Sequence, residues 1–152
     1  MLPPQIWKRR LENEYQQMRN SGTKFEVNSD YTEYVLSLNG PGLYREGDHV
    51  LEKNKHAVKI ELNRNYPYPG GVEITWLTPI FHPNIREEDG KVCIQLVNDW
   101  AENQTITNVV NALQYLLKNP NPSDPLNKEA AAYYENQGNK PEPGKPRIVS
   151  GL

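Results

Sequence analysis

Hydrophobic residues in the first twenty positions recur with the period of a helix. These residues, spaced by four, four and three positions, are Trp7, Leu11, Tyr15 and Met18. Such spacing places them on one face of a helix. Two prolines precede the stretch and a Ser-Gly pair follows it, as is typical of a helix start and stop. The pattern predicts an amphipathic N-terminal helix with one apolar and one charged face.

Alternating patterns after this helix predict strands. Apolar and polar residues alternate within residues 34–38, 58–62 and 72–77, as in strands with one buried face. The connection between the first two, residues 39–55, begins with the turn-rich NGPG and is otherwise polar, so we expect antiparallel strands joined by hairpins. The YPYPGG segment at 66–71 cannot be a central strand, because its two prolines have no amide hydrogen to donate. A rigid proline loop therefore leads into the last of these strands.

Two further helices are predicted in the C-terminal part of the chain. The first has an apolar face formed by Val109, Val110, Leu113, Leu116 and Leu117. Thr107 is its expected N-cap, and the proline-rich residues 119–125 end it. A shorter helix follows from about Asn127 to Gln137, with Gly138 placed to terminate it.

The order of these elements is that of an α+β domain whose helices pack on one antiparallel sheet. A chain of 152 residues fits a single core of this kind. We assign residues 1–138 to the domain. Residues 139–152 are rich in proline and glycine and are expected to form a C-terminal tail that is disordered or lies loosely on the surface.

Charge and composition narrow the class of partner. The 17 basic and 19 acidic residues give a net charge of −2 and are scattered along the chain without a basic block. Proteins or small molecules are therefore the expected partners, rather than nucleic acid or a membrane surface. No apolar run approaches the roughly 20 residues of a membrane span, and the N-terminus lacks the apolar core of a signal peptide. Because the single cysteine excludes an internal disulfide, we expect a cytoplasmic protein with a reduced thiol.

That cysteine, Cys93, lies in the stretch HPNIREEDGKVCIQL, residues 82–96. Its apolar neighbours would suit a small buried residue with no chemical role. His82 could equally be a structural histidine in a proline turn, and Asn84 could stabilise its loop through an Asx turn. Taken singly, these residues do not define a reaction.

The order of motifs, in contrast, resembles that of the ubiquitin-conjugating enzyme family. From Pro4 to about Asn136, the motifs are YPYPGG, HPNI, GKVC, a tryptophan seven residues beyond the cysteine, TITNVVNALQYLL, NPNPSDPLN and EAAAYY. The resemblance implies the UBC fold, in which an N-terminal helix, a four-stranded antiparallel meander and an irregular active-site stretch precede helices packed on the sheet. Prolines from Pro141 onward imply that the C-terminal helical region is shortened.

The resemblance also implies a transferase that carries ubiquitin or a ubiquitin-like protein as a thioester on Cys93 and passes it to a lysine amine. Asn84 would donate a hydrogen bond to the oxyanion that forms, with stabilisation of its own loop as the competing role. Asp124 would help the lysine to lose its proton, unless it belongs only to a helix-terminating loop. Supporting residues of the site are His82, Pro83, Asn121 and Trp100.

By the same resemblance, the partners are a ubiquitin-activating enzyme, a RING-type ligase and protein substrates with accessible lysines, and no cofactor or metal is expected. The activating enzyme would contact the basic residues Lys8, Arg9 and Arg10, which could also be only a solvated helix face. The residues expected to contact a ligase are Leu62, Tyr66, Tyr68, Ala101 and Glu102. Tyr66 could equally belong to the core of its loop.

Two other classes of function fit parts of the sequence. A catalytically weak scaffold of the same fold could merely bind ubiquitin, although the inactive relatives of this kind lack the cysteine. A cysteine hydrolase would pair Cys93 with His82 or His56 as a base. That pairing requires an imidazole within hydrogen-bond reach of the sulfur.

Overall fold

Four antiparallel strands form the central sheet of the protein, whose computed structural model describes residues 1–92 and 104–138. In chain order the elements are α1 (Pro4–Arg19), β1 (Lys24–Val27), β2 (Glu33–Asn39), β3 (Leu43–Glu46), β4 (His49–Glu52), β5 (Lys55–Leu62), β6 (Val72–Trp76), α3 (Ile106–Lys118) and α4 (Lys128–Gly138). The strand order of the central sheet is β1-β2-β5-β6, and β3 and β4 pair separately. The sheet is thus a meander with the β3–β4 hairpin inserted between its second and third strands.

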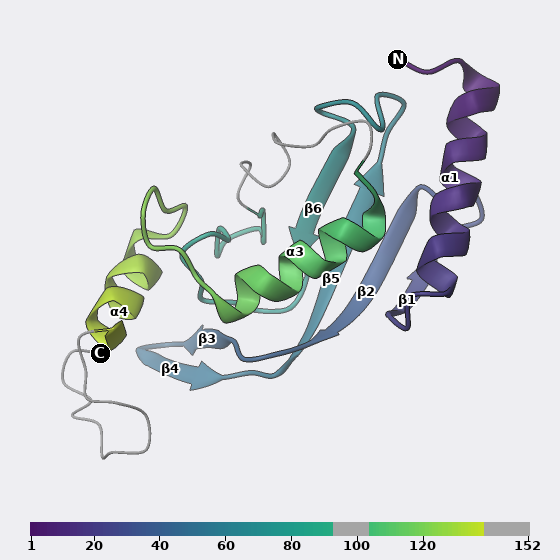
Figure 1. Cartoon of the computed structure of the whole chain (residues 1–152). Helices are drawn as coiled ribbons and strands as arrows, with labels where there is room; N and C mark the ends of the chain where they lie inside the picture. The colour runs from purple at the N-terminus through teal and green to yellow at the C-terminus, as the bar shows by residue number, and fades with distance from the viewer. Residues whose placement is uncertain (93–103, 139–152) are drawn as a thin grey trace.

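The hydrophobic core lies between this sheet and α3. Val58 on β5 pairs with Leu36 on β2 and with Trp76 on β6, so three strands contribute side chains to the same face. Helix α3 crosses that face and buries Val109 and Leu113 within the core cluster (Figure 1). Helix α1 lies beside the β1 edge of the sheet (Figure 1).

The structure confirms the predicted α+β architecture, including the N-terminal helix, the three alternating strands and both later helices. Along α1, Leu11 and Met18 are buried, and Trp7 and Tyr15 are half-buried, as the apolar periodicity predicts. The same face of α1 also buries a carboxylate, that of Glu14, which the pattern did not predict.

Two details of the sequence prediction are wrong. Residues 39–55 are not only a polar connection, because they contain β3 and β4, joined by a turn with Gly47 at a φ of 59°. No residue of these two strands is buried, so their sequence shows no alternation of apolar and polar residues. The N-cap of α3 is Thr105, whose side chain accepts the N–H of Asn108 at 3.2 Å, whereas Thr107 lies inside the first turn.

Helix α4 lies beyond the end of α3, next to the β3–β4 hairpin (Figure 1). Its Tyr133 ring meets Phe81 edge-on, with ring centroids 5.9 Å apart. At the start of α4, the side chain of Asn127 accepts the N–H of Ala130 at 3.0 Å. The first contact packs α4 against the chain that follows β6, and the second caps the start of α4. None of the helices described here is long and apolar enough to cross a membrane.

Candidate active site

The HPNI motif forms a tight turn that is fixed to α3 by a histidine ring. His82 and Ile85 pair in an isolated antiparallel bridge. Nδ1 of His82 accepts the N–H of Asn84 at 3.0 Å, and its Nε2–H donates to the carbonyl of Leu116 at 2.9 Å. The ring is fully buried. It therefore sets the conformation of the turn and its position relative to α3.

His82 is neutral in this environment. An amide N–H can only donate and a carbonyl can only accept, so the proton of the ring is on Nε2. Burial lowers the pKa of His82 to about 4, against the hydrogen bond to Leu116, which raises it. With both ring nitrogens engaged, His82 is not available as a base for a thiol. His56 is also buried, and its Nε2 lies 3.1 Å from the carbonyl of Gly40.

Asn84 joins the turn to the loop between α3 and α4. Its side chain is buried, and it donates to the carbonyl of Asn121 and accepts the N–H of the same residue, both at 2.9 Å. The carbonyl of Pro83 accepts the N–H groups of Leu126 and Asn127 at 2.8 and 3.1 Å. The HPN turn thus holds the main chain of this loop at its beginning and at its end.

The same loop presents Asn121 and Asp124 to solvent. The side-chain oxygen of Asn121 accepts the N–H of Ser123 at 3.0 Å and its hydroxyl at 2.6 Å, which tightens the loop. Asp124 is exposed and has a φ of 52°, a left-handed conformation that aspartate adopts more readily than most residues. The structure therefore brings Asn84 and Asn121 into contact and leaves the Asp124 carboxylate free of burial.

A short hairpin leads from the HPN turn towards the cysteine. The N–H of Arg86 donates to the carbonyl of Lys91 at 2.8 Å, and the N–H of Gly90 donates to the carbonyl of Arg86 at 2.8 Å. The Arg86 guanidinium also pairs with the Asp89 carboxylate at 2.6 Å. Hydrogen bonds from Arg86 and from the Lys91 N–H lower the pKa of Asp89 to about 2. The turn is thus closed by its own main chain and by one ion pair.

Gly90 packs this hairpin directly onto β6. The N–H of Trp76 donates to the Gly90 carbonyl at 2.7 Å, and Gly90 has a φ of 76°. A Cβ at this position would lie 1.9 Å from the carbonyl oxygen of Trp76, so only glycine fits. Two residues later, the N–H of Val92 donates to the carbonyl of Ile74 at 3.4 Å. The chain is therefore held by the sheet up to the residue before Cys93.

Cys93 itself lies outside the described residues, as do Trp100, Ala101 and Glu102. Their predicted roles stay predictions. Within residues 1–92 and 104–138, no group of three or more histidine, cysteine, aspartate or glutamate side chains is arranged to hold a metal ion.

Two of the predicted ligase contacts are core residues. Leu62 is 4% exposed, because it lies on the core-facing side of β5. Tyr66 is 0% exposed, because its hydroxyl turns inward to donate to Glu14. This burial contradicts the prediction of direct ligase contact for both side chains. Tyr68, in the same proline loop, is half-exposed.

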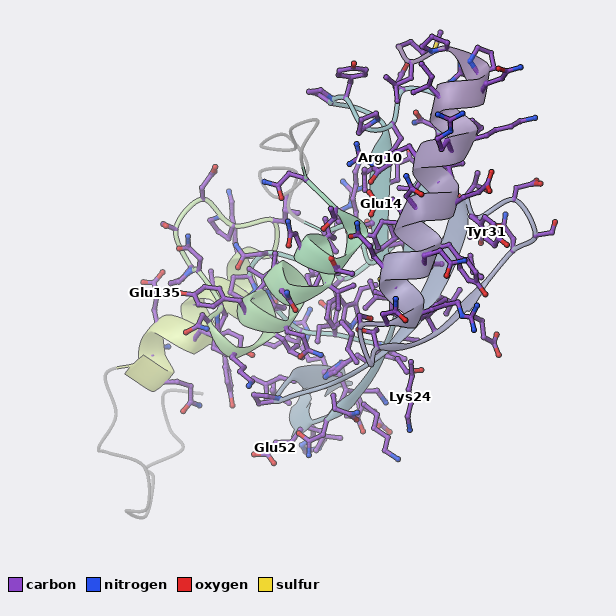
Figure 2. The ribbon with its side chains drawn as sticks, turned by 45° about the vertical axis from the view of Figure 1, so that its right-hand side comes forward. Arg10, Glu14, Lys24, Tyr31, Glu52 and Glu135 are labelled. Atoms are coloured by element: carbon purple, nitrogen blue, oxygen red, sulfur yellow. The ribbon has the colours of Figure 1, made fainter. Side chains whose placement is uncertain are left out.

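The three basic residues of α1 that are predicted to contact the activating enzyme also differ in their exposure. Lys8 and Arg9 are exposed. Arg10 instead pairs with Glu14, with Nε 3.1 Å from the carboxylate, and its guanidinium lies 5.3 Å from the centre of the Tyr66 ring. Figure 2 shows Arg10 and Glu14 on the side of α1 that faces α3. A charge placed between Leu11 and Met18 on an apolar helix face was the sequence signal for this contact.

A second ionic cluster, also not predicted, joins the hairpin that precedes the cysteine to β3 and α4. Arg45 on β3 pairs with Glu87 in this hairpin and with Glu129 in α4, and its guanidinium lies 4.6 Å from the centre of the Phe81 ring. Beside it is an open depression of about 600 Å³, also lined by Arg86, Glu88, Leu126, Asn127 and Lys128. The cluster connects three elements at the edge of the candidate site.

A family profile described as ubiquitin-conjugating enzyme matches residues 10–142. The chain belongs to the ubiquitin-conjugating enzyme family. The structure agrees, because the E2 domain of a ubiquitin conjugating enzyme from Toxoplasma gondii superposes on it with a TM-score of 0.69 and 26% identity, over 86% of this chain and 88% of that one. The predicted UBC fold is therefore confirmed.

The names of individual relatives refer to different modifier proteins. Ubiquitin-conjugating enzyme E2 5 of Arabidopsis thaliana is 35% identical over 127 residues, which are 82% of this chain and 65% of that protein. Nedd8-conjugating enzyme UbcE2M of Drosophila melanogaster is 34% identical over 121 residues, which are 78% of this chain and 62% of that protein. The chain spans less than two thirds of the length of each of these two relatives.

Proposed function

We propose that this protein accepts ubiquitin or a ubiquitin-like protein from an activating enzyme as a thioester on Cys93 and transfers it to a lysine amine, together with a RING-type ligase. The observation that carries the proposal is the rigid frame from His82 to Val92. It ends at the residue before the only cysteine of a chain that belongs to this family. Because the thiol must stay reduced, we place the reaction in a reducing compartment such as the cytoplasm.

Both transfers are acyl transfers at one carbonyl carbon. In the first, the Cys93 thiolate attacks the thioester of the activating enzyme, a new C–S bond forms, and the thiolate of the activating enzyme leaves. In the second, a lysine amine attacks the Cys93 thioester, an isopeptide bond forms, and the Cys93 thiolate leaves while the amine loses a proton. The second step requires a donor for the oxyanion and a route for that proton.

Asn84 can serve as the oxyanion donor without leaving its place in the loop. Its NH2 group has two hydrogens, and one of them is used in the bond to the Asn121 carbonyl. The second hydrogen is then the one offered to the oxyanion. The two roles considered for Asn84 are thus compatible, because the bonds to Asn121 fix the orientation of the donor.

Asp124 is proposed to assist the proton loss of the incoming lysine. Its carboxylate is exposed in a loop held by Asn84 and Pro83, so an amine from another protein can approach it. Leu126 and Asn127, at the end of this loop, line an open depression on which the acceptor protein is proposed to dock. Lys8 and Arg9 remain the proposed contacts for the activating enzyme, and Tyr68 the proposed contact for the ligase.

The hydrolase alternative loses support from the two histidines on which it depends. His82 is neutral with both ring nitrogens hydrogen-bonded, and His56 is buried against the carbonyl of Gly40. Burial lowers the pKa of both imidazoles, which weakens them as bases.

A charging assay tests the proposal. The protein is incubated with ATP, ubiquitin and an active ubiquitin-activating enzyme, and in parallel with Nedd8 and its activating enzyme, and is then run on gels with and without reducing agent. We expect a thiol-sensitive adduct with at least one modifier. It should be absent in Cys93→Ala and thiol-resistant if Cys93→Ser forms an oxyester. No adduct with activating enzymes that charge a control protein would favour the ubiquitin-binding scaffold.

A further inference from the structure

Glu14 is a glutamate on the inner face of α1 whose side chain is 1% exposed. Burying a carboxylate is costly unless hydrogen bonds and an opposite charge replace the lost water. A glutamate at this position needs partners that an apolar side chain would not. Its partners therefore show which parts of the fold it connects.

Three donors from three parts of the chain meet on the Glu14 carboxylate. Oε2 accepts the Nε–H of Arg10 at 3.1 Å and the hydroxyl hydrogen of Tyr66. Oε1 accepts the N–H of Ile106 at 3.2 Å. Arg10 belongs to α1, Tyr66 to the proline loop before β6, and Ile106 is the first residue of α3.

The tyrosine is suited to be a permanent donor in this cluster. Burial and the nearby Glu14 carboxylate raise the pKa of Tyr66, so its hydroxyl keeps its proton. The Arg10 guanidinium covers the face of the same ring, at 5.3 Å from its centre. The carboxylate is thus enclosed by a cation and two neutral donors.

The start of α3 is the natural place for such a carboxylate. The first N–H groups of a helix have no partner within the helix, and the helix dipole favours a negative charge there. Glu14 accepts the first of these N–H groups, and Thr105 accepts that of Asn108. A residue of α1 therefore completes the N-terminal cap of α3.

Arg10 extends the cluster by one more residue along the chain. Its Nη2 donates to the carbonyl of Gln104. Gln104 is where the described chain resumes after residues 93–103, which include Cys93. Arg10 and Glu14 together therefore hold two anchor points, Gln104 and Ile106, directly after the segment that contains the cysteine.

We propose that Glu14 is a positioning residue for the thioester chemistry, because it fixes the point at which the cysteine-containing segment rejoins the fold. The proposal rests on the proposed function of Cys93. The sheet holds the chain just before the cysteine through Gly90 and Val92, and the Glu14 cluster holds it just after this segment. Loss of the Glu14 carboxylate would release Ile106 and the Arg10 side chain that holds Gln104. A displacement of about 1 Å at a reacting group can lower a rate by about 100-fold.

The test compares Glu14→Gln with two matched controls. Gln has the length of Glu but no charge, so it loses the ion pair with Arg10. The first control is Glu12→Gln, which makes the same change at an exposed position of α1. The second is Val58→Ala, which weakens the core at a residue that is not one of the three donors to Glu14. Each protein is assayed the same number of degrees below its own Tm, so that differences in stability do not enter the comparison.

Two rates are measured for each protein, and they are expected to move in opposite directions. The first is alkylation by iodoacetamide, which reports on Cys93 alone because the chain has no other cysteine. The second is discharge of the thioester to free lysine. In Glu14→Gln we expect alkylation to be about fivefold faster, since the thiol is more accessible, and discharge to be about tenfold slower. Both controls should stay within about twofold of the unmodified protein, since neither alters the anchor.

The outcomes separate this inference from the proposed function. Unchanged alkylation in Glu14→Gln, or the same changes in Val58→Ala, would overturn the positioning role. Faster alkylation in Glu14→Gln, combined with failure of the unmodified protein to become charged, would show that Glu14 controls access to Cys93 but would reject the thioester chemistry that the proposed function assigns to it. If Glu14→Gln does not fold, Tyr66→Phe removes a single donor and should change alkylation in the same direction by a smaller factor. Unchanged alkylation in Tyr66→Phe would then also overturn the inference.

Discussion

The side-chain amide of Asn84 joins the HPN turn to the loop between α3 and α4 through both its oxygen and its NH2 group. The oxygen and one hydrogen are bound to the main chain of Asn121, so the group cannot rotate. A donor that is held in place before the reaction needs no reorganisation when the oxyanion forms. The remaining hydrogen is therefore the part of Asn84 that chemistry would use.

Replacing Asn84 by aspartate removes the donor and keeps an acceptor for the Asn121 N–H. We expect single-turnover discharge to free lysine to fall by about 100-fold, because an oxyanion would lose its hydrogen bond. Charging by the activating enzyme should fall by less than about threefold, since the Cys93 thiolate is its own nucleophile. Ser123→Ala, which removes one bond to Asn121 from the same loop, is the control. Equal losses in the two variants would show that Asn84 acts only through loop structure.

Gly90 is a second position with a strict requirement, because an added Cβ atom would clash with the Trp76 main chain. In Gly90→Ala we expect the free energy of unfolding to fall by about 3 kcal/mol, because left-handed strain is added to the disruption of the Trp76 hydrogen bond. Urea titration measures this change. Gly70→Ala is the matched control, since Gly70 has a φ of 85° with no atom within 4 Å of an added Cβ. It should cost only about 1 kcal/mol. Similar losses in both would mean that the close contact with Trp76 is relieved by local movement.

At the scale of elements, the helices and strands that bury one face could be predicted from the sequence. The spacing of Leu11 and Met18, and the alternation through Val58, follow directly from the periods of helix and strand. The strands β3 and β4 could not be predicted in this way, because neither buries a side chain. Glu14 was missed for a related reason, since periodicity assigns every charge to the solvent.

Less of the candidate site than of the fold could be predicted from the sequence. Motif order placed Asn84 and Asn121 in one site, and the structure brings them into contact. The family resemblance predicts Leu62 and Tyr66 as partner contacts, whereas both are buried. The direction of a side chain in an irregular loop depends on contacts with distant residues, such as Glu14 for Tyr66, and a single sequence does not display these contacts.

The link between the HPN turn and α3 should make stability depend on pH. The pKa of His82 is lower in the folded state, at about 4, than the ordinary value of 6.5. The stabilisation from the neutral ring is therefore complete above pH 6.5 and is lost as the pH falls towards 4. We expect the free energy of unfolding to decrease by about 2.5 kcal/mol from this group between pH 7.5 and pH 4.5, as measured by urea titration at each pH.

Two substitutions test whether His82 is the source of that dependence. His82→Gln should be less stable at neutral pH, but it should lack this part of the decrease on acidification. His49→Gln removes an exposed histidine and should leave the decrease unchanged. If the decrease is the same in all three proteins, other groups must cause it.

At the scale of the whole molecule, the buried residues of the described chain extend from Leu11 to Ala131. We therefore propose that residues 1–138 are sufficient for the fold. A chain ending at Gly138 should lose less than about 1 kcal/mol of stability and melt within about 4 °C of the full chain. A chain ending at Asn127 lacks α4, with the buried Ala130 and Ala131, and should lose about 3 kcal/mol or more. Thermal melting followed by circular dichroism measures both. Equal losses in the two truncated chains would contradict the proposed boundary.

The β3–β4 hairpin has a consequence for how such a protein can diversify. Within the described part of the chain, its two strands pair with each other and with no further strand, and a Cβ added at Gly47 would have no atom within 4 Å. Lengthening a loop costs little, about 0.6 kcal/mol for each doubling, when the ends remain where they are. A lineage could thus acquire an inserted recognition peptide at this tip without rebuilding the meander. For the same reason, the tip is a practical place to graft an epitope or a fluorescent label without altering the HPN turn or the loop between α3 and α4.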